Sequence, residues 1–436
     1  MRARLAQATR TPPNRLRLAG VVLAVLTIAF GGLTAWQLED RARAAERVVT
    51  HSQPLSRDAA EIHRRLAGAA TTATTGFLLA GNEPTTVRKE YEQDLARTAE
   101  LITSAAALAG TASRAKEPLT LLGQQLTVYA GLVENARADN RQGIPLGGAY
   151  LRYASEQMQK ELLQTAGRLS DYEDRELAAD YAAAKAVPWA AYGLGLVTLA
   201  ALVWVQLTLF RRTNRVFNIG LLGATAAVLA GTLWLTAAGL GTTFALQRSF
   251  EQGAAPLRAL NSARVDVLTA RLNENLHFVA RGSTAKYTDA WTATITHLDG
   301  SAPDGTRRPG GGTLGEALKL APADAAGDIA KATEQYGSWL RQHEAARALE
   351  VNSTDYEGAL KATVTADGGG TTADAFFKAT DEALGKAAEA EQKSLTNAAK
   401  GTDWDLRAAA VAVALSGLVA AAAALRGLGR RLAEYR

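Results

Sequence analysis

The side chains best suited to chemistry in this chain are five histidines, and their spacing limits what they can do. They are His51, His63, His277, His297 and His343. A zinc site on a helix needs two ligands three or four residues apart on one face, and no two of these histidines have that separation. The chain also contains no cysteine, which excludes thiolate metal sites, disulfides and cysteine nucleophiles. We therefore expect neither a metal ion nor another cofactor.

Neighbouring carboxylates are a second possible source of chemistry, because paired acids can carry out general acid–base catalysis. Such groups are Glu39 with Asp40, Asp171 with Glu173 and Asp174, and Glu389 with Glu391. Each group lies in a highly charged segment with basic neighbours, which is typical of the solvated face of a helix. We assign no catalytic residue among them.

Two glycine-rich runs have the composition of nucleotide-binding loops but not their pattern. Residues 310–315 lack the Gly-Lys-Ser/Thr ending of a phosphate-binding loop and follow no predicted strand, so we interpret them as a flexible connector. Residues 427–429 fail the dinucleotide-binding pattern for the same reason. Without a catalytic constellation, we predict that the protein is not an enzyme.

Four long stretches without a charged residue divide the chain and define the segments in which these side chains lie. They cover residues 18–38, 187–210, 216–246 and 408–425. A helix rises about 1.5 Å per residue, so roughly 20 residues cross about 30 Å of hydrocarbon. The sequence thus predicts four transmembrane helices. The first stretch could instead be a cleaved signal peptide, but its long apolar run favours an uncleaved anchor.

Short basic segments mark one side of the predicted membrane. They are residues 1–17, the loop 211–215 and the tail 426–436. Among their arginines are Arg211, Arg212, Arg215, Arg430 and Arg431. Short segments rich in arginine stay in the cytoplasm, so these residues are expected there, where they fix the topology and could contact a cytoplasmic partner.

The two remaining blocks, 39–186 and 247–407, are then predicted to lie outside the plasma membrane, with both termini in the cytoplasm. Trp36, Trp189 and Trp404 fall where three of the spans would meet the outer interface, a depth at which tryptophan is enriched. The net charge of +5 largely reflects the cytoplasmic arginines. It indicates contact with anionic lipids in the bilayer rather than with nucleic acid.

Both outer blocks are predicted to be helical bundles. They are rich in helix-forming residues, and apolar residues recur at three- and four-residue spacing, as at Leu119, Leu122 and Leu126. Chain-breaking residues divide each block into four pieces, with loops expected at 299–315 and 351–373. The outer helices are expected to continue into the spans, with Pro188 as the one candidate break. The fold class is thus all-α, with four transmembrane helices and two four-helix bundles.

The second half repeats features of the first half in the same order, which indicates an internal duplication. The matched features are Pro54-Leu55 with Pro256-Leu257, Phe77 with Phe278, Tyr129 with Tyr336, and Glu156 with Glu382. Arg152 pairs with Lys378 in this alignment. These two repeat-matched cations are our candidates for binding an anionic ligand.

The spans contain no ionisable residue, and Gln206 is their most polar side chain. Ion and proton pathways usually need intramembrane ionisable groups, so transport is disfavoured. The predicted cytoplasmic segments are too short to hold a kinase or another signalling domain. We expect any message that crosses the membrane to be passed to a separate soluble protein.

In this arrangement, each half resembles the sensory half of a bacterial chemoreceptor, a four-helix bundle between two spans. The whole chain is similar to the actinobacterial GlnX-type four-span signalling proteins in its two helical outer blocks and Arg-rich cytoplasmic ends. The resemblance implies partnership with an amino-acid-binding lipoprotein outside the cell and a soluble Ser/Thr kinase inside it.

The sequence leaves three functions open. The leading hypothesis is a relay that passes amino-acid availability from a solute-binding protein to a cytoplasmic kinase. The binding protein would dock on the turns farthest from the membrane. The alternatives are a direct small-molecule sensor of the chemoreceptor type and a structural scaffold of the cell envelope.

Overall fold

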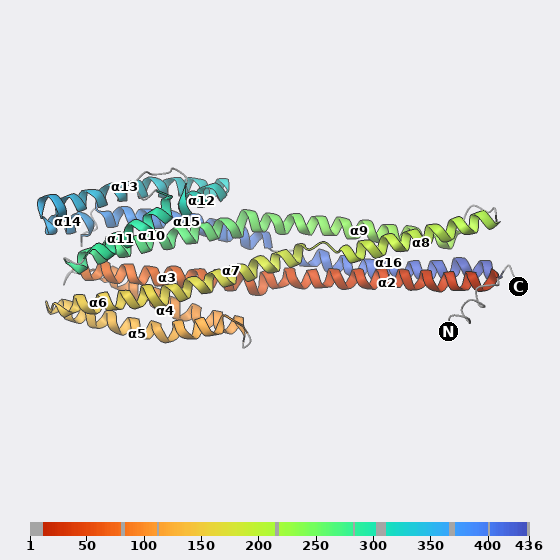
Figure 1. Ribbon diagram of the computed structural model, residues 1–436, viewed down its shortest axis with the longest axis horizontal. Helices are drawn as coiled ribbons and strands as arrows, with labels where there is room; N and C mark the ends of the chain where they lie inside the picture. The colour runs from red at the N-terminus through yellow and green to blue at the C-terminus, as the bar shows by residue number, and fades with distance from the viewer. Residues whose placement is uncertain are drawn as a thin grey trace. The chain divides into compact units, whose positions relative to one another are not determined.

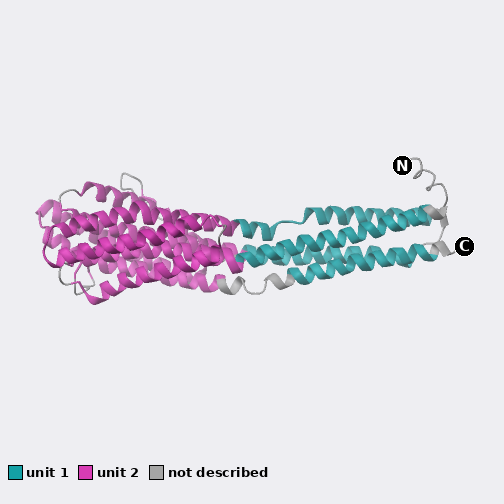
Figure 2. Cartoon of the chain, turned by 90° about the horizontal axis from the view of Figure 1, so that it is seen from below, with its two compact units in different colours: residues 1–48, 179–247, 399–436 teal, residues 49–178, 248–398 magenta. Residues whose placement is uncertain are grey.

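A computed structural model gives the fold, and every regular element of its described residues is helical (Figure 1). The described residues are 12–79, 83–110, 113–213, 218–281, 284–301, 311–365, 371–399 and 402–433. They form two compact units, each assembled from separate stretches of the chain (Figure 2). Unit 1 comprises residues 1–48, 179–247 and 399–436, and unit 2 comprises residues 49–178 and 248–398.

Unit 1 contains the four helices that could cross a membrane by length and composition. They are α2 (Pro12–Arg47), α8 (Trp189–Thr213), α9 (Ile219–Ser249) and α16 (Thr402–Ala433). Many of their large apolar side chains are exposed, among them Val25, Leu196, Leu233 and Val411. Such surfaces are unfavourable in water and suit a lipid solvent. The chain is therefore compatible with a multi-pass membrane protein.

Glycines allow the helices of unit 1 to pack closely, and α2 and α16 lie side by side (Figure 1). A Cβ atom added at Gly31 would lie 3.2 Å from the Cα atom of Gly417. At another crossing, the side chain of Asn218, the residue before α9, donates a hydrogen bond of 2.9 Å to the carbonyl of Gly427 in α16. Gln206 donates at 3.0 Å to the carbonyl of Leu221, which ties α8 to α9. These contacts fit the small-residue and polar packing of membrane helices.

Unit 2 is built around two long helices, α3 (Gln53–Leu78) and α10 (Ala255–Ala280), which pack against each other. A π-helical turn precedes each of them, η1 (Val48–Ser52) before α3 and η3 (Phe250–Ala254) before α10. Each has proline in its first turn, where the missing N–H has no intrahelical partner to lose.

Further helices of unit 2 flank this central pair. The first block adds α4 (Thr85–Ala109), α5 (Lys116–Arg141), α6 (Leu146–Gln157), η2 (Met158–Leu162) and α7 (Leu163–Lys185), the last of which ends in unit 1. The second block adds α11 (Ala285–Asp299), α12 (Gly312–Leu320), α13 (Ala323–Ser353), α14 (Tyr356–Thr363) and α15 (Ala373–Ala399). One hydrophobic core runs through both blocks and includes Leu66, Tyr129 and Leu162 from the first and Leu272 and Trp339 from the second.

Three expectations from the sequence need correction. The expected loop 299–315 ends in helix, because α12 begins at Gly312, which has a positive φ of 62° that favours glycine. The expected loop 351–373 contains α14, whose start is capped by a hydrogen bond of 2.8 Å from the backbone N–H of Gly358 to the Asp355 side chain. The helix that leads into the second span is interrupted between α7 and α8 at Pro188, which restricts the preceding residue.

The contact between α2 and α16 yields a test with a matched control. Substituting Gly31→Leu would force the two helices apart and is expected to lower the melting temperature of the purified protein by several degrees. Gly32→Leu places the same side chain one residue later, where an added Cβ meets nothing within 4 Å. Thermal unfolding in detergent should leave the Gly32 variant close to the parent. Equal losses for both variants would contradict the packing described.

Candidate functional site

The contact between α3 and α10 joins the two sequence blocks through small and polar side chains. Residues 67–76 of α3 are all Ala, Gly or Thr, so the two helices approach closely. The Thr71 hydroxyl donates a hydrogen bond of 2.9 Å to the carbonyl of Leu268. In return, the buried Asn275 amide of α10 donates to the hydroxyls of Thr74 at 3.1 Å and Thr75 at 2.9 Å. We call this contact the α3–α10 seam.

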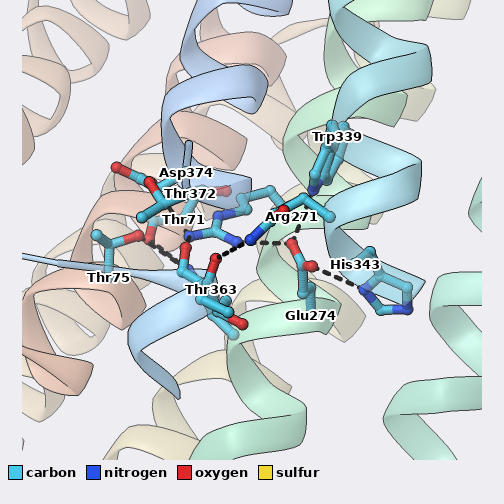
Figure 3. Close-up of polar contacts among 12 residues, drawn as sticks. Thr71, Thr75, Arg271, Glu274, Trp339, His343, Thr363, Thr372 and Asp374 are labelled. Atoms are coloured by element: carbon cyan, nitrogen blue, oxygen red, sulfur yellow. Dashed lines mark hydrogen bonds and ion pairs between the residues drawn. The ribbon is translucent and has the colours of Figure 1, made fainter. Parts of the chain in front are cut away.

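A buried charge network lies on α10 beside the seam (Figure 3). At its centre is Arg271, whose side chain has no exposed surface. Its guanidinium lies 2.6 Å from the Glu274 carboxylate and 3.1 Å from the Asp374 carboxylate of α15. It also donates a hydrogen bond of 3.2 Å to the carbonyl of Thr363 at the end of α14.

Glu274 extends the network to α13. The Trp339 indole N–H donates to it at 2.9 Å, and Nδ1 of His343 donates at 2.7 Å. Burial by itself would raise the pKa of Glu274, but the charge of Arg271 and the bonds from Arg271 and His343 outweigh burial and lower this pKa to about 2. Glu274 is therefore ionised at neutral pH.

The network makes α10 the central element of unit 2. One face of α10 bonds to α3 through Asn275, and Arg271 and Glu274 bond to α13, α14 and α15. Removing one partner of a buried ion pair leaves an uncompensated charge, so such a network resists partial rearrangement. The network thus ties α13, α14 and α15 to α10, which makes it a candidate element for transmitting a signal.

The two cations predicted to bind an anionic ligand lie at the edges between the blocks. Lys378 of α15 pairs with Asp374 at 2.9 Å, and it is the exposed end of the network around Arg271. Its charge also lowers the pKa of Glu90 on α4, although burial raises that pKa overall. Arg152 of α6 acts in the same way on Tyr287 of α11. Each cation thus faces the other block, and the ligand-binding role of both stays a prediction.

The predicted cytoplasmic arginines are only partly within the described side chains. Arg211 and Arg430 are exposed at the ends of α8 and α16. Arg215 and the side chains of Arg212 and Arg431 lie outside the described part of the structure. Their proposed contact with a cytoplasmic partner stays a prediction.

Unit 2 also contains a cleft between the two blocks. It has a volume of about 670 Å³ and is lined by α3, α7, η3, α10, α11, α12 and α15. That volume lies within the usual range for sites that bind small molecules. Within the described residues, no group of three or more His, Cys, Asp or Glu side chains could hold a metal ion.

The sequence analysis missed the charge network, although a signal for it exists. Leu260, Ala263 and Val267 form an apolar stripe with spacings of three and four residues, and Arg271 and Glu274 continue that stripe. Two charges at core positions predict a buried ion pair. Their partner Asp374 lies a hundred residues away, and no local pattern points to it.

Comparison with known proteins supports a sensing role. Residues 44–182 match the model of a family described as an actinobacterial sensor domain. The matched segment runs from the end of α2 through α3 to α7. Neither curated proteins nor solved structures yielded a match. The matched segment, in a helical chain with four membrane-compatible helices, indicates a sensing or signalling role.

The charge network can be tested by removing its central cation. Substituting Arg271→Met removes the central cation from Glu274 and leaves Asp374 with its exposed partner Lys378, which is expected to destabilise unit 2 by about 3–5 kcal/mol. The control is Lys386→Met, which breaks an exposed pair with Glu382. Thermal unfolding should show a large fall for the first variant and little change for the second. Similar melting temperatures for both would show that the network does not stabilise the fold.

A second buried carboxylate predicts a dependence of stability on pH. Glu173 of α7 is 3% exposed, and its Oε1 atom has no hydrogen-bond partner in the described structure. Burial, followed by the charges of Glu176 and Asp174, raises its pKa from 4.5 to about 7. The folded state therefore prefers the protonated acid, and the stability present below pH 4.5 is lost as the pH rises toward 7.

Glu173→Gln should thus raise the melting temperature at pH 8 and have a smaller effect at pH 5. Glu161→Gln, an exposed acid in η2, is the control for loss of one negative charge. The melting temperatures of both variants and the parent protein are compared at pH 5 and pH 8. A shift of the same size at pH 5 and pH 8 would rule out a titrating Glu173.

Proposed function

We propose that the protein is a transmembrane relay that passes amino-acid availability from an extracytoplasmic solute-binding protein to a cytoplasmic Ser/Thr kinase. The observation that carries the proposal is the sensor-family match over 44–182 in a chain with four membrane-compatible helices. In this proposal the helices of unit 1 span the plasma membrane, both termini are cytoplasmic, and the protein acts through its partners rather than as an enzyme.

An internal duplication is part of the proposal, and several paired contacts support it. The carbonyl of Phe77 at the end of α3 accepts a hydrogen bond from Asn140, and that of Phe278 at the end of α10 accepts one from Tyr356. Both central helices follow a π-helical turn. The two blocks would then be related four-helix bundles, joined as a receptor dimer would be.

The docking surface proposed for the binding protein is the end of unit 2 where α3 and α10 finish. Apolar residues of both blocks meet there, including Leu78, Leu151, Phe278 and Val364. Three apolar side chains are exposed near these helix ends: Ile144 just before α6, Leu146 at its start and Val351 near the end of α13. Exposed apolar side chains of this kind suit contact with another protein.

The proposed cytoplasmic partner would contact the short loop between α8 and α9 together with the end of α16. The bond from Asn218 to Gly427 holds the start of α9 against α16, so a movement of either helix is shared with the other. Arg211 and Arg430 would supply positive charge to an acidic surface of the kinase and to anionic lipid headgroups.

The test is affinity purification of the full-length protein from gently solubilised native membranes, followed by mass spectrometry. Recovery of a solute-binding protein and a protein kinase is expected. The double variant Ile144→Asp, Val351→Asp should lose the binding protein but keep the kinase. Val128→Asp, an exposed apolar residue in the middle of α5, should keep both. If crosslinked parent protein is recovered alone, the relay is wrong and a direct sensor or an envelope scaffold remains.

Direct sensing of a small molecule is the second candidate function, because the 670 Å³ cleft in unit 2 favours it. The cleft includes side chains of both blocks, so a ligand bound in it would contact both halves at once. In that case a ligand should raise the melting temperature of the purified protein without any partner.

A further inference from the structure

The lining of the cleft in unit 2 carries more negative than positive charge. Its carboxylates are Asp171, Asp174, Asp266 and Glu316, which come from both blocks. Burial is the main cause that raises the pKa of both Asp174 and Asp266. An additional positive charge in the cleft would therefore stabilise the ionised form of each acid.

The arginines of the lining are already neutralised by partners. Arg57 lies 2.9 Å from the carboxylate of Asp58, and Arg258 lies 3.1 Å from that of Asp174. Asp266 accepts hydrogen bonds of 2.9 Å from His297 and 2.7 Å from Thr313. Because both arginines pair with other acids, neither compensates the negative charge of Asp171 or Glu316. The cleft as a whole is therefore acidic.

An imidazole without hydrogen bonds also faces this space. His63 of α3 lines the cleft, and among the described residues none forms a hydrogen bond with its ring. Burial lowers the pKa of His63 to about 4 against the opposing effect of Asp171. The ring is thus neutral at pH 7 and offers one donor and one acceptor nitrogen to a ligand.

The rest of the lining is compatible with a hydrocarbon chain. Leu177, Leu257, Leu320 and Leu395 contribute apolar surface to the same cleft. The carboxylates do not gather into a metal site within the described residues. An acidic cleft with apolar walls and dispersed carboxylates suits an organic cation better than a metal ion.

We propose that this cleft binds a small organic cation, an amine whose ammonium group pairs with Asp171 and Glu316 and whose hydrocarbon part packs on the leucines. The proposal rests on the second candidate function, direct sensing. Because the ligand would touch α3 and α7 of one block and α10 and α12 of the other, its binding would favour one arrangement of the two blocks.

The absence of cysteine allows a direct test on the full-length protein in lipid nanodiscs. Ser170→Cys places a single thiol in the cleft lining, and Ser104→Cys places one on the exposed face of α4 as the reference. Each thiol is labelled with 2-aminoethyl methanethiosulfonate, which is cationic, and with its anionic 2-sulfonatoethyl analogue. For each variant, the labelling rate with the cationic reagent is divided by the labelling rate with the anionic reagent. The ratio for Ser170→Cys is then divided by the ratio for Ser104→Cys, which gives the normalised preference.

We expect this normalised preference to be about tenfold or more, because clefts lined by one sign of charge concentrate the opposite ion. Adding Asp171→Asn and Glu316→Gln should reduce it several-fold. Glu357→Gln, an exposed acid on α14, should leave it unchanged. At matched ionic strength, 1,4-diaminobutane should slow labelling in the cleft, and 1,4-butanediol should not.

Three results would overturn the proposal. They are a normalised preference near one, a thiol at position 170 that neither reagent reaches, and equal protection by the diamine and the diol. None of these results bears on whether the protein recruits a binding protein or a kinase. The proposal that the cleft binds an amine and the proposal of a relay can therefore be supported or rejected independently.

Discussion

The close packing of α3 against α10 is the contact on which the rest of unit 2 depends. It is possible because the middle of α3 consists of alanine, glycine and threonine, which let the two backbones approach. Polar groups brought that close need hydrogen-bond partners, and the Thr71 hydroxyl and the Asn275 amide N–H find theirs across the seam. Both sequence blocks consequently share one hydrophobic core. The charge network around Arg271 then fixes α13, α14 and α15 to the same central helix.

The sequence predicts the elements of this protein well because its signals are local. Uncharged stretches reveal α2, α8, α9 and α16, and apolar spacing reveals the helices of unit 2. Short helices were missed where glycine was interpreted as a connector, as at Gly312. The seam and the network were missed for another reason. Apart from the pair Arg271–Glu274, the bonds described join residues 65 to 201 positions apart, such as Thr71 with Leu268. Contacts between residues so distant in sequence arise from the tertiary fold, and no local pattern predicts them.

The two candidate functions use different parts of unit 2, yet both act on the same central pair of helices. A binding protein at the far ends of α3 and α10 would contact the exposed Ile144 and Val351, which lie beside the buried apolar cluster of Leu78 and Phe278. An amine in the cleft would contact the first turns of the same helices. A packed core passes small shifts along rigid helices because its interfaces have discrete arrangements. Either input would therefore act by shifting one block against the other.

Pulsed electron paramagnetic resonance can show whether the shared core holds both blocks together as one body. In the cysteine-free chain, Ser104→Cys on α4 and Ala293→Cys on α11 place nitroxide labels on exposed positions of different blocks. With a shared core we expect one narrow distance distribution for the full-length protein in nanodiscs, or two narrow ones if two arrangements are populated. A broad, continuous distribution would mean that the blocks move independently and that the α3–α10 seam does not hold them together.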